Sequence, residues 1–126
     1  MKGCSRTLPT NPAVTAESSP LRGEVWLVSF DPSVGGEIRK TRPAVVLSND
    51  TANAVLNRIQ VVPISSEVDR LYPAEAAILL NGEPRKAMAD QISTVSKRRL
   101  QRRLGALGKD DLDAVIRAVR LQLGLG

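Results

Sequence analysis

The residues best suited to chemistry in this 126-residue chain lie in the segment 31–41 and at Arg42, which follows it. The segment holds a Gly-Gly pair, the carboxylate of Glu37 and the cations Arg39 and Lys40. Two glycines give a loop the backbone freedom to close on a ligand. The proline after Arg42 holds the arginine backbone extended, which fixes the direction in which the side chain projects. The segment is therefore either a ligand-binding loop that ends at an anchored arginine or a surface loop with solvated charges.

Two hydroxyl side chains, Ser65 and Ser66, follow the apolar run 61–64 and form a second candidate. If this run is a strand next to the one that begins at Arg42, the hydroxyls lie near the arginine and add neutral hydrogen-bond donors. Serines after a strand also commonly form a turn or cap the next segment. The spacing alone leaves both interpretations open.

A basic run, residues 97–103, carries five positive charges in seven residues. Such a run can contact phosphates with an affinity that falls as salt rises. A solvated basic face, or an attachment patch for an acidic protein, has the same composition. The run cannot specify a nucleotide sequence by itself.

The composition excludes several kinds of catalysis. The chain has no histidine, which removes the commonest general base, the commonest metal ligand and any Ser-His-Asp triad. Its single cysteine, Cys4, allows neither an internal disulfide nor a cysteine-rich zinc site, so we expect no metal and a reducing compartment. The net charge of +5 favours a polyanionic partner, and an aromatic content of 2% argues against a platform of stacked aromatic side chains.

The elements that must position these residues are mostly short strands. Apolar and β-branched runs predict strands over 24–30, 42–48, 59–64 and 74–80, a polar-capped helix over 51–56, and two short strands or one bent strand over 86–89 and 91–95. The Asn81-Gly82 pair predicts a tight turn after the fourth strand. Strands this short and numerous indicate a small barrel or sandwich.

The two ends of the chain differ from this middle part. Residues 1–20 contain three prolines and no long apolar run, which predicts a disordered tail before a single domain over 21–126. Apolar residues spaced 3, 1, 3 and 4 apart between Leu112 and Leu123 predict a C-terminal helix that covers the sheet or a partner subunit. No apolar segment is long enough for a secretory signal or a membrane span, so we expect a cytoplasmic protein that does not contact membranes.

The residues also resemble a known family over about 21–125. The segments that carry the resemblance are Arg22-Gly23-Glu24-Val25-Trp26-Leu27-Val28, Asp31-Pro32, Gly36-Glu37, Thr41-Arg42-Pro43-Ala44-Val45-Val46-Leu47-Ser48-Asn49-Asp50, Val62-Pro63-Ile64-Ser65-Ser66 and Ala89-Asp90-Gln91-Ile92. In their order and spacing they are similar to the MazF/PemK family of toxin endoribonucleases.

The resemblance implies a mainly β fold, a small SH3-like β-barrel with a C-terminal helix, shared with CcdB-type toxins. It implies a homodimer that an acidic MazE-like antitoxin neutralises. It also implies cleavage of single-stranded mRNA at short sequences, without metal or cofactor, by 2′-hydroxyl attack that leaves a 2′,3′-cyclic phosphate and a 5′-hydroxyl. Translation would thereby be inhibited.

The resemblance also assigns residues. Arg42, Ser65 and Glu37 match the family's catalytic positions, although Ser65 stands where threonine is usual. Serine keeps the hydroxyl donor and loses the methyl group that restricts its rotamers.

The RNA-binding candidates are then six further residues: Arg39, Lys40, Thr41, Ser66, Asp90 and Gln91. Asp90 has a structural alternative, the capping of a bend between strands. Met88 occupies a position where some PemK-type relatives use an arginine, so that version of the site is not expected.

Two rival functions remain at this level. One is a CcdB-like toxin that binds and poisons DNA gyrase without cutting RNA, but such toxins use a tryptophan near the C-terminus and the only tryptophan here is Trp26. The other is a non-catalytic nucleic-acid-binding barrel. It explains the charge but not the coincidence of Glu37, Arg42 and Ser65.

Overall fold

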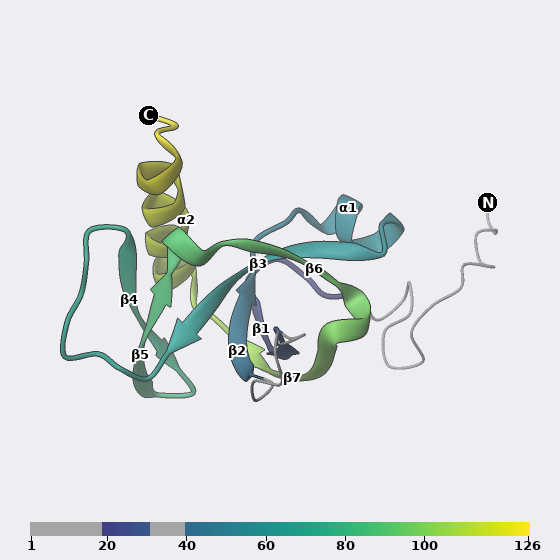
Figure 1. Cartoon of the computed structure of the whole chain (residues 1–126), viewed down its shortest axis with the longest axis horizontal. Coiled ribbons are helices and arrows are strands. Elements are labelled where there is room, and N and C mark those ends of the chain that lie inside the picture. The colour runs from purple at the N-terminus through teal and green to yellow at the C-terminus, as the bar shows by residue number, and fades with distance from the viewer. Residues whose placement is uncertain (1–18, 31–39) are drawn as a thin grey trace, which may run out of the picture.

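The computed structural model describes residues 19–30 and 40–126, which form a curled antiparallel half-barrel with a long helix packed on one side (Figure 1). The elements in chain order are β1 (Glu24–Ser29), β2 (Thr41–Val46), α1 (Asp50–Val55), β3 (Arg58–Ser65), β4 (Glu75–Leu80), β5 (Glu83–Met88), η2 (Ala89–Gln91), β6 (Ser93–Ser96), η3 (Lys97–Arg99), β7 (Leu100–Ala106) and α2 (Lys109–Leu123). The strand order is β4-β5-β3-β2-β1-β7, and β6 pairs with β3. The predicted mainly β fold with a C-terminal helix is confirmed. None of the helices in the described part is long and apolar enough to cross a membrane.

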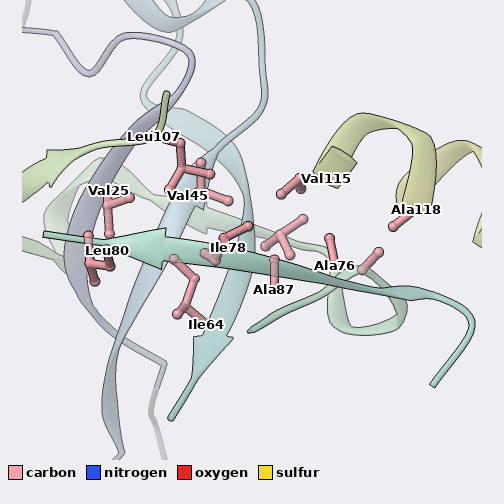
Figure 2. Close-up of a cluster of buried hydrophobic side chains, with 12 residues drawn as sticks. Val25, Val45, Ile64, Ala76, Ile78, Leu80, Ala87, Leu107, Val115 and Ala118 are labelled. Carbon is pink, nitrogen blue, oxygen red and sulfur yellow. The ribbon is translucent and has the colours of Figure 1, made fainter. Parts of the chain in front are cut away.

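The central strands β2 and β3 are buried on both faces, which explains their nearly continuous apolar sequences. On one face, Val45, Val62 and Ile64 join the core beneath α2, where Val115 and Ala118 of the helix face the sheet (Figure 2). On the other face the core consists of Trp26, Val28, Ala44, Val46, Ile59, Val61, Val95 and Leu100. Each fully buried valine or isoleucine contributes about 1.5–3 kcal/mol, so burial holds in the sheet the two strands that carry Arg42 and Ser65.

Pro63 lies where β3 changes its partner. On one edge β3 pairs with β6 as far as Val61 and with β5 from Ile64 onward. The Leu47 N–H donates to the Gln60 carbonyl (2.9 Å), so the backbone of Gln60 faces β2. Because this direction alternates along a strand, the backbone of Pro63 faces the opposite edge, between the two partners. The missing N–H is tolerated there, and β5 begins to pair beside Ser65.

The β4–β5 hairpin turns at Asn81-Gly82, as predicted. Asn81 has a φ of 52° and Gly82 a φ of 82°, the positive values that a tight two-residue hairpin turn requires. The Asn81 side-chain amide donates to the Leu104 carbonyl of β7 (3.2 Å). The tip of the hairpin thereby reaches the other edge strand and curls the sheet.

Several boundaries differ from the sequence-based expectation. The apolar runs around 86–95 form two strands rather than one bent strand, because the 3-10 turn η2 separates β5 from β6. The basic run becomes η3 and most of β7, a strand that the sequence pattern did not predict. In α2, Val115 is fully buried as expected, whereas Leu123 is 54% exposed.

The predicted tail lies almost entirely outside the described residues. Pro20, at its end, is fully buried.

Candidate active site

One polar pocket, with a volume of about 630 Å³, brings together the predicted arginine and both predicted hydroxyls. Its lining residues are Lys40, Thr41, Arg42, Pro43, Ile64, Ser65, Ser66 and Arg85. They come from the start of β2, the end of β3 and the middle of β5, three neighbouring strands. The lining carries three cations and no carboxylate, so within the described part of the chain it suits an anionic ligand.

Arg42 is held by the pairing of β2 with β1. It lies opposite Val28, and Pro43 lies opposite Leu27. The Arg42 side chain is half-buried, so the guanidinium is anchored at the rim and can still reach a ligand. Its planar fork can give two charge-assisted hydrogen bonds to one phosphate.

The described residues on either side of 31–39 meet next to this pocket. The Phe30 N–H donates to the carbonyl of Lys40 (2.9 Å), which joins the described ends on either side of 31–39. Glu37 and Arg39 lie outside the described residues. Of the remaining loop candidates, Lys40 and Thr41 line the pocket.

Ser65 is the last residue of β3, and its hydroxyl serves the turn that follows. The Glu67 N–H donates to Ser65 Oγ (3.0 Å), so this serine caps the next segment, as one interpretation expected. The same bond leaves the hydroxyl proton of Ser65 free to be donated and orients the oxygen. Ser65 can therefore accept the hydrogen bond of the turn and donate one to a ligand at the same time.

A buried ion pair fixes the strand that closes the pocket. Lys86 of β5 pairs in register with Ser65, and its Nζ lies 2.9 Å from Glu75 Oε1, with both side chains less than 10% exposed. The same ammonium donates to the Arg70 carbonyl (2.8 Å) and lies 5.6 Å from the centroid of the Tyr72 ring. These contacts tie the segment between β3 and β4 to β5.

The pKa of Glu75 reflects this environment. Burial alone would raise it, but the hydrogen bond from the Tyr72 N–H (2.9 Å) and the bond and charge of Lys86 hold the pKa below its ordinary value. Glu75 is thus ionised at neutral pH.

Other predicted residues lie away from the pocket. Asp90 and Gln91 are exposed on η2 and do not line it, and Gln91 Nε2 lies 3.6 Å from Met88 Sδ. In the basic run, Arg103 forms an ion pair with Glu24 (3.0 Å) and Arg99 donates to the Ser29 carbonyl (3.3 Å). Part of that run is therefore structural.

Metal ligands do not gather in the described part of the chain. Across residues 19–30 and 40–126, no three side chains of His, Cys, Asp or Glu lie close enough together to hold a metal ion. The described lining of the pocket itself supplies hydrogen-bond donors and positive charge.

Residues 21–123, which include all of the pocket, match the family model described as PemK-like, MazF-like toxin of type II toxin-antitoxin system. The chain belongs to this toxin family.

Individual relatives agree over nearly their whole length. Endoribonuclease MazF9 of Mycobacterium tuberculosis is 38% identical over an alignment of 115 positions, and the match covers 82% of this chain and 96% of that protein. The structure of MazE-MazF (Form-II) from Deinococcus radiodurans is 28% identical with a TM-score of 0.73, covering 86% of this chain and 98% of that one. A mycobacterial endoribonuclease in complex with its cognate antitoxin, at 24% identity and a TM-score of 0.71, covers the same 86% of this chain and 98% of its own. The likeness to endoribonuclease MazF9 favours the ribonuclease over the gyrase-binding alternative.

One pocket residue of this MazF-like toxin, Arg85, was missed from the sequence. The available signal was the alternation in 83–88, where Lys86 and Arg85 must point to opposite faces of a strand. The pattern could not show that this strand pairs with the Ser65 end of β3, because the pairing is long-range.

Proposed function

We propose that this MazF-type endoribonuclease cleaves single-stranded RNA without metal, at short sequences, through attack of a 2′-hydroxyl on the adjacent phosphorus. The bond from the 2′-oxygen to phosphorus forms as the bond to the 5′-oxygen breaks, which leaves a 2′,3′-cyclic phosphate and a 5′-hydroxyl. The observation that carries the proposal is the single pocket in which Arg42 and Ser65 lie together. Cleavage of mRNA in this way inhibits translation.

Arg42 is the proposed electrostatic catalyst. The transition state gathers extra negative charge on the non-bridging oxygens of the phosphate, so preorganised donors there lower the barrier most. A guanidinium supplies two such donors and stays protonated at any working pH. Ser65 adds a neutral donor, and its oxygen is oriented by the bond from the Glu67 N–H.

Glu37 is the proposed acceptor of the 2′-hydroxyl proton. A general base must come within hydrogen-bond reach of the proton that it removes. In the sequence Glu37 lies three residues before Lys40, which lines the pocket. The cations Lys40 and Arg42 line the pocket and would attract a carboxylate that enters it.

The proposed RNA track extends from this centre to the bases. Reading a sequence requires single-stranded bases with accessible edges. Arg39, Lys40, Thr41 and Ser66 are the proposed contacts near the cleaved bond, and Asp90 and Gln91, exposed on η2, are proposed for bases further along.

Incubation of purified protein with a long unstructured RNA in EDTA tests the mechanism, with the fragment ends identified by mass spectrometry. We expect cyclic phosphate and 5′-hydroxyl ends. The Arg42→Ala variant should lose about 100- to 1000-fold in rate, the usual effect of removing one transition-state donor, with an unchanged circular dichroism spectrum. Cleavage that needs a divalent metal, or full activity in the variant, would refute the assignment.

We also propose a homodimer in the cytoplasm that an acidic MazE-like antitoxin inhibits. Support comes from the mycobacterial endoribonuclease, whose structure is described as a complex with its cognate antitoxin, and from the cationic pocket, which an acidic segment would block. Light scattering of the purified protein should give twice the mass of one chain. Added antitoxin should suppress RNA cleavage in proportion to its concentration.

A further inference from the structure

The pocket contains a cation that the proposed reaction does not use. Arg85 lies on β5, on the far side of β3 from Arg42. The two arginines therefore approach the pocket from opposite walls. Neighbouring strands are about 4.8 Å apart, so two arginines that are two strands apart start about 10 Å from each other.

The strand fixes the direction of Arg85. Side chains alternate between the two faces of a strand, and the next residue, Lys86, points into the fold, where it is 6% exposed and paired with Glu75. Arg85 therefore points to the opposite face of β5 from Lys86, where it is half-buried and lines the pocket. Its Nη1 donates to the carbonyl of Pro84 (2.7 Å), which leaves its remaining N–H groups for a ligand.

Arg85 and Lys86, which are neighbours in β5, differ in whether a carboxylate balances their charge. Lys86 is neutralised inside the protein by Glu75. No carboxylate of residues 19–30 or 40–126 forms an ion pair with Arg85. The hydroxyl side chain of Ser66, just past the end of β3, lines the same side of the pocket. A guanidinium without an ion-pair partner among the described residues, next to a hydroxyl, matches a phosphate.

We propose that Arg85 and Ser66 form a second phosphate subsite, which holds the RNA phosphate next to the one that is cut. The inference rests on the proposed function, because it takes Arg42 and Ser65 as the site of the scissile phosphate. Because the two arginines reach the pocket from strands on either side of β3, two successive phosphates of an extended strand can each be bound by one arginine. The second subsite fixes the register of the RNA, so that a defined bond lies at Arg42.

Two variants test this subsite. Arg85→Gln removes the charge from the pocket, and Arg58→Gln is the matched control, since Arg58 is exposed at the opposite end of β3. We expect Arg85→Gln to raise KM for an RNA oligonucleotide by about 10- to 100-fold, typical of a lost hydrogen bond to a charged group, with kcat nearly unchanged. Arg58→Gln should leave both constants close to those of the wild type, and Arg85→Lys should restore part of the loss.

Methylphosphonate linkages, which carry no charge, show which RNA phosphate Arg85 contacts. In each test oligonucleotide a methylphosphonate replaces the phosphate on either the 5′ or the 3′ side of the cleaved linkage. For the wild type, we expect only one of these two replacements to raise KM. In Arg85→Gln that same replacement should have no further effect, because the charge it removes has already lost its partner. With an uncleavable 2′-deoxy substrate, Arg85→Gln should also lower the slope of log affinity against log salt by about 0.7, the value for one single-strand phosphate contact.

The possible outcomes distinguish a failure of the second subsite from a failure of the proposed RNA cleavage. If the wild type does not cut RNA in EDTA, the proposed function itself fails. If the wild type cuts but Arg85→Gln behaves like Arg58→Gln, or lowers kcat with KM unchanged, the subsite is refuted. Additive effects of the variant and both methylphosphonates would refute it as well. Should Arg85→Gln unfold, Arg85→Lys and the methylphosphonate series on the wild type decide.

Discussion

Removing one partner of the ion pair between Lys86 and Glu75 should be among the most destabilising single changes in this toxin. Glu75→Gln keeps the size of the side chain and removes its charge, which leaves the ammonium of Lys86, 7% exposed, without a counter-ion. Removing one partner of a buried pair costs about 3–5 kcal/mol, out of a total of about 5–15 kcal/mol for a domain. The melting temperature should fall by roughly 12–40 °C, at about 4–8 °C per kcal/mol for a domain of this size.

The pH dependence of this difference follows from the lowered pKa of Glu75. A carboxyl group whose pKa is lower in the folded state stabilises the fold at any pH above its unfolded value, about 4.3. That stability is lost as the pH falls through the folded pKa. The gap between wild type and Glu75→Gln should therefore be constant between pH 6 and 8 and should close in acid.

Urea unfolding at several pH values measures both effects. Lys86→Met is the matched variant. The double variant should lose less free energy of unfolding than the two single variants added together, because each single variant leaves one buried charge without its partner and the double variant leaves none. A loss below about 1 kcal/mol at pH 7 would place this pair with ordinary surface pairs and refute the reasoning. A gap that persists unchanged at pH 3 would show that the charge is not its cause.

Three further changes have defined outcomes. Asn53→Ala removes a fully buried amide that donates to the Ser48 carbonyl (2.9 Å) and accepts from the Ser48 hydroxyl (2.6 Å), so urea unfolding should show a loss of about 1–3 kcal/mol; no loss would mean that water replaces the amide. Gly23→Ala places a Cβ 3.1 Å from Leu112 at a φ of +94° and should cost about 1–2 kcal/mol in thermal unfolding; a neutral result would contradict the strain. Arg42→Lys keeps the charge and loses the fork, so initial rates should show kcat reduced by about 10- to 100-fold; full activity would mean that charge alone suffices.

Local pattern was sufficient for those elements whose side chains face an apolar core. β1 to β4 and α2 could be predicted because burial sets their periodicity. β7 could not, since its Arg102 and Arg103 are exposed and its extended form comes from pairing with β1. In β7, pairing with a strand far away in the sequence therefore decides the structure, and the local strand propensity does not.

The site residues also differ in whether local sequence pattern could predict them. Arg42 and Ser65 could be predicted because each directly adjoins a strongly apolar strand, and the family pattern names both. Arg85 could not, because its place depends on which strand pairs with the end of β3. Asp90 and Gln91 were assigned from the family pattern alone, and they lie on η2 outside the pocket.

The contact between α2 and β4 has a consequence for behaviour at high concentration. Asp111 accepts a hydrogen bond from the Leu79 N–H (2.9 Å), on the outer edge of the sheet. An edge strand with free backbone donors invites strand pairing between molecules and hence aggregation. The helix blocks one edge through this carboxylate, and the exposed arginines of β7 repel a like edge at the other. The outer strands β4 and β7 are thus protected from pairing with strands of another molecule, while the cationic pocket stays open to a ligand.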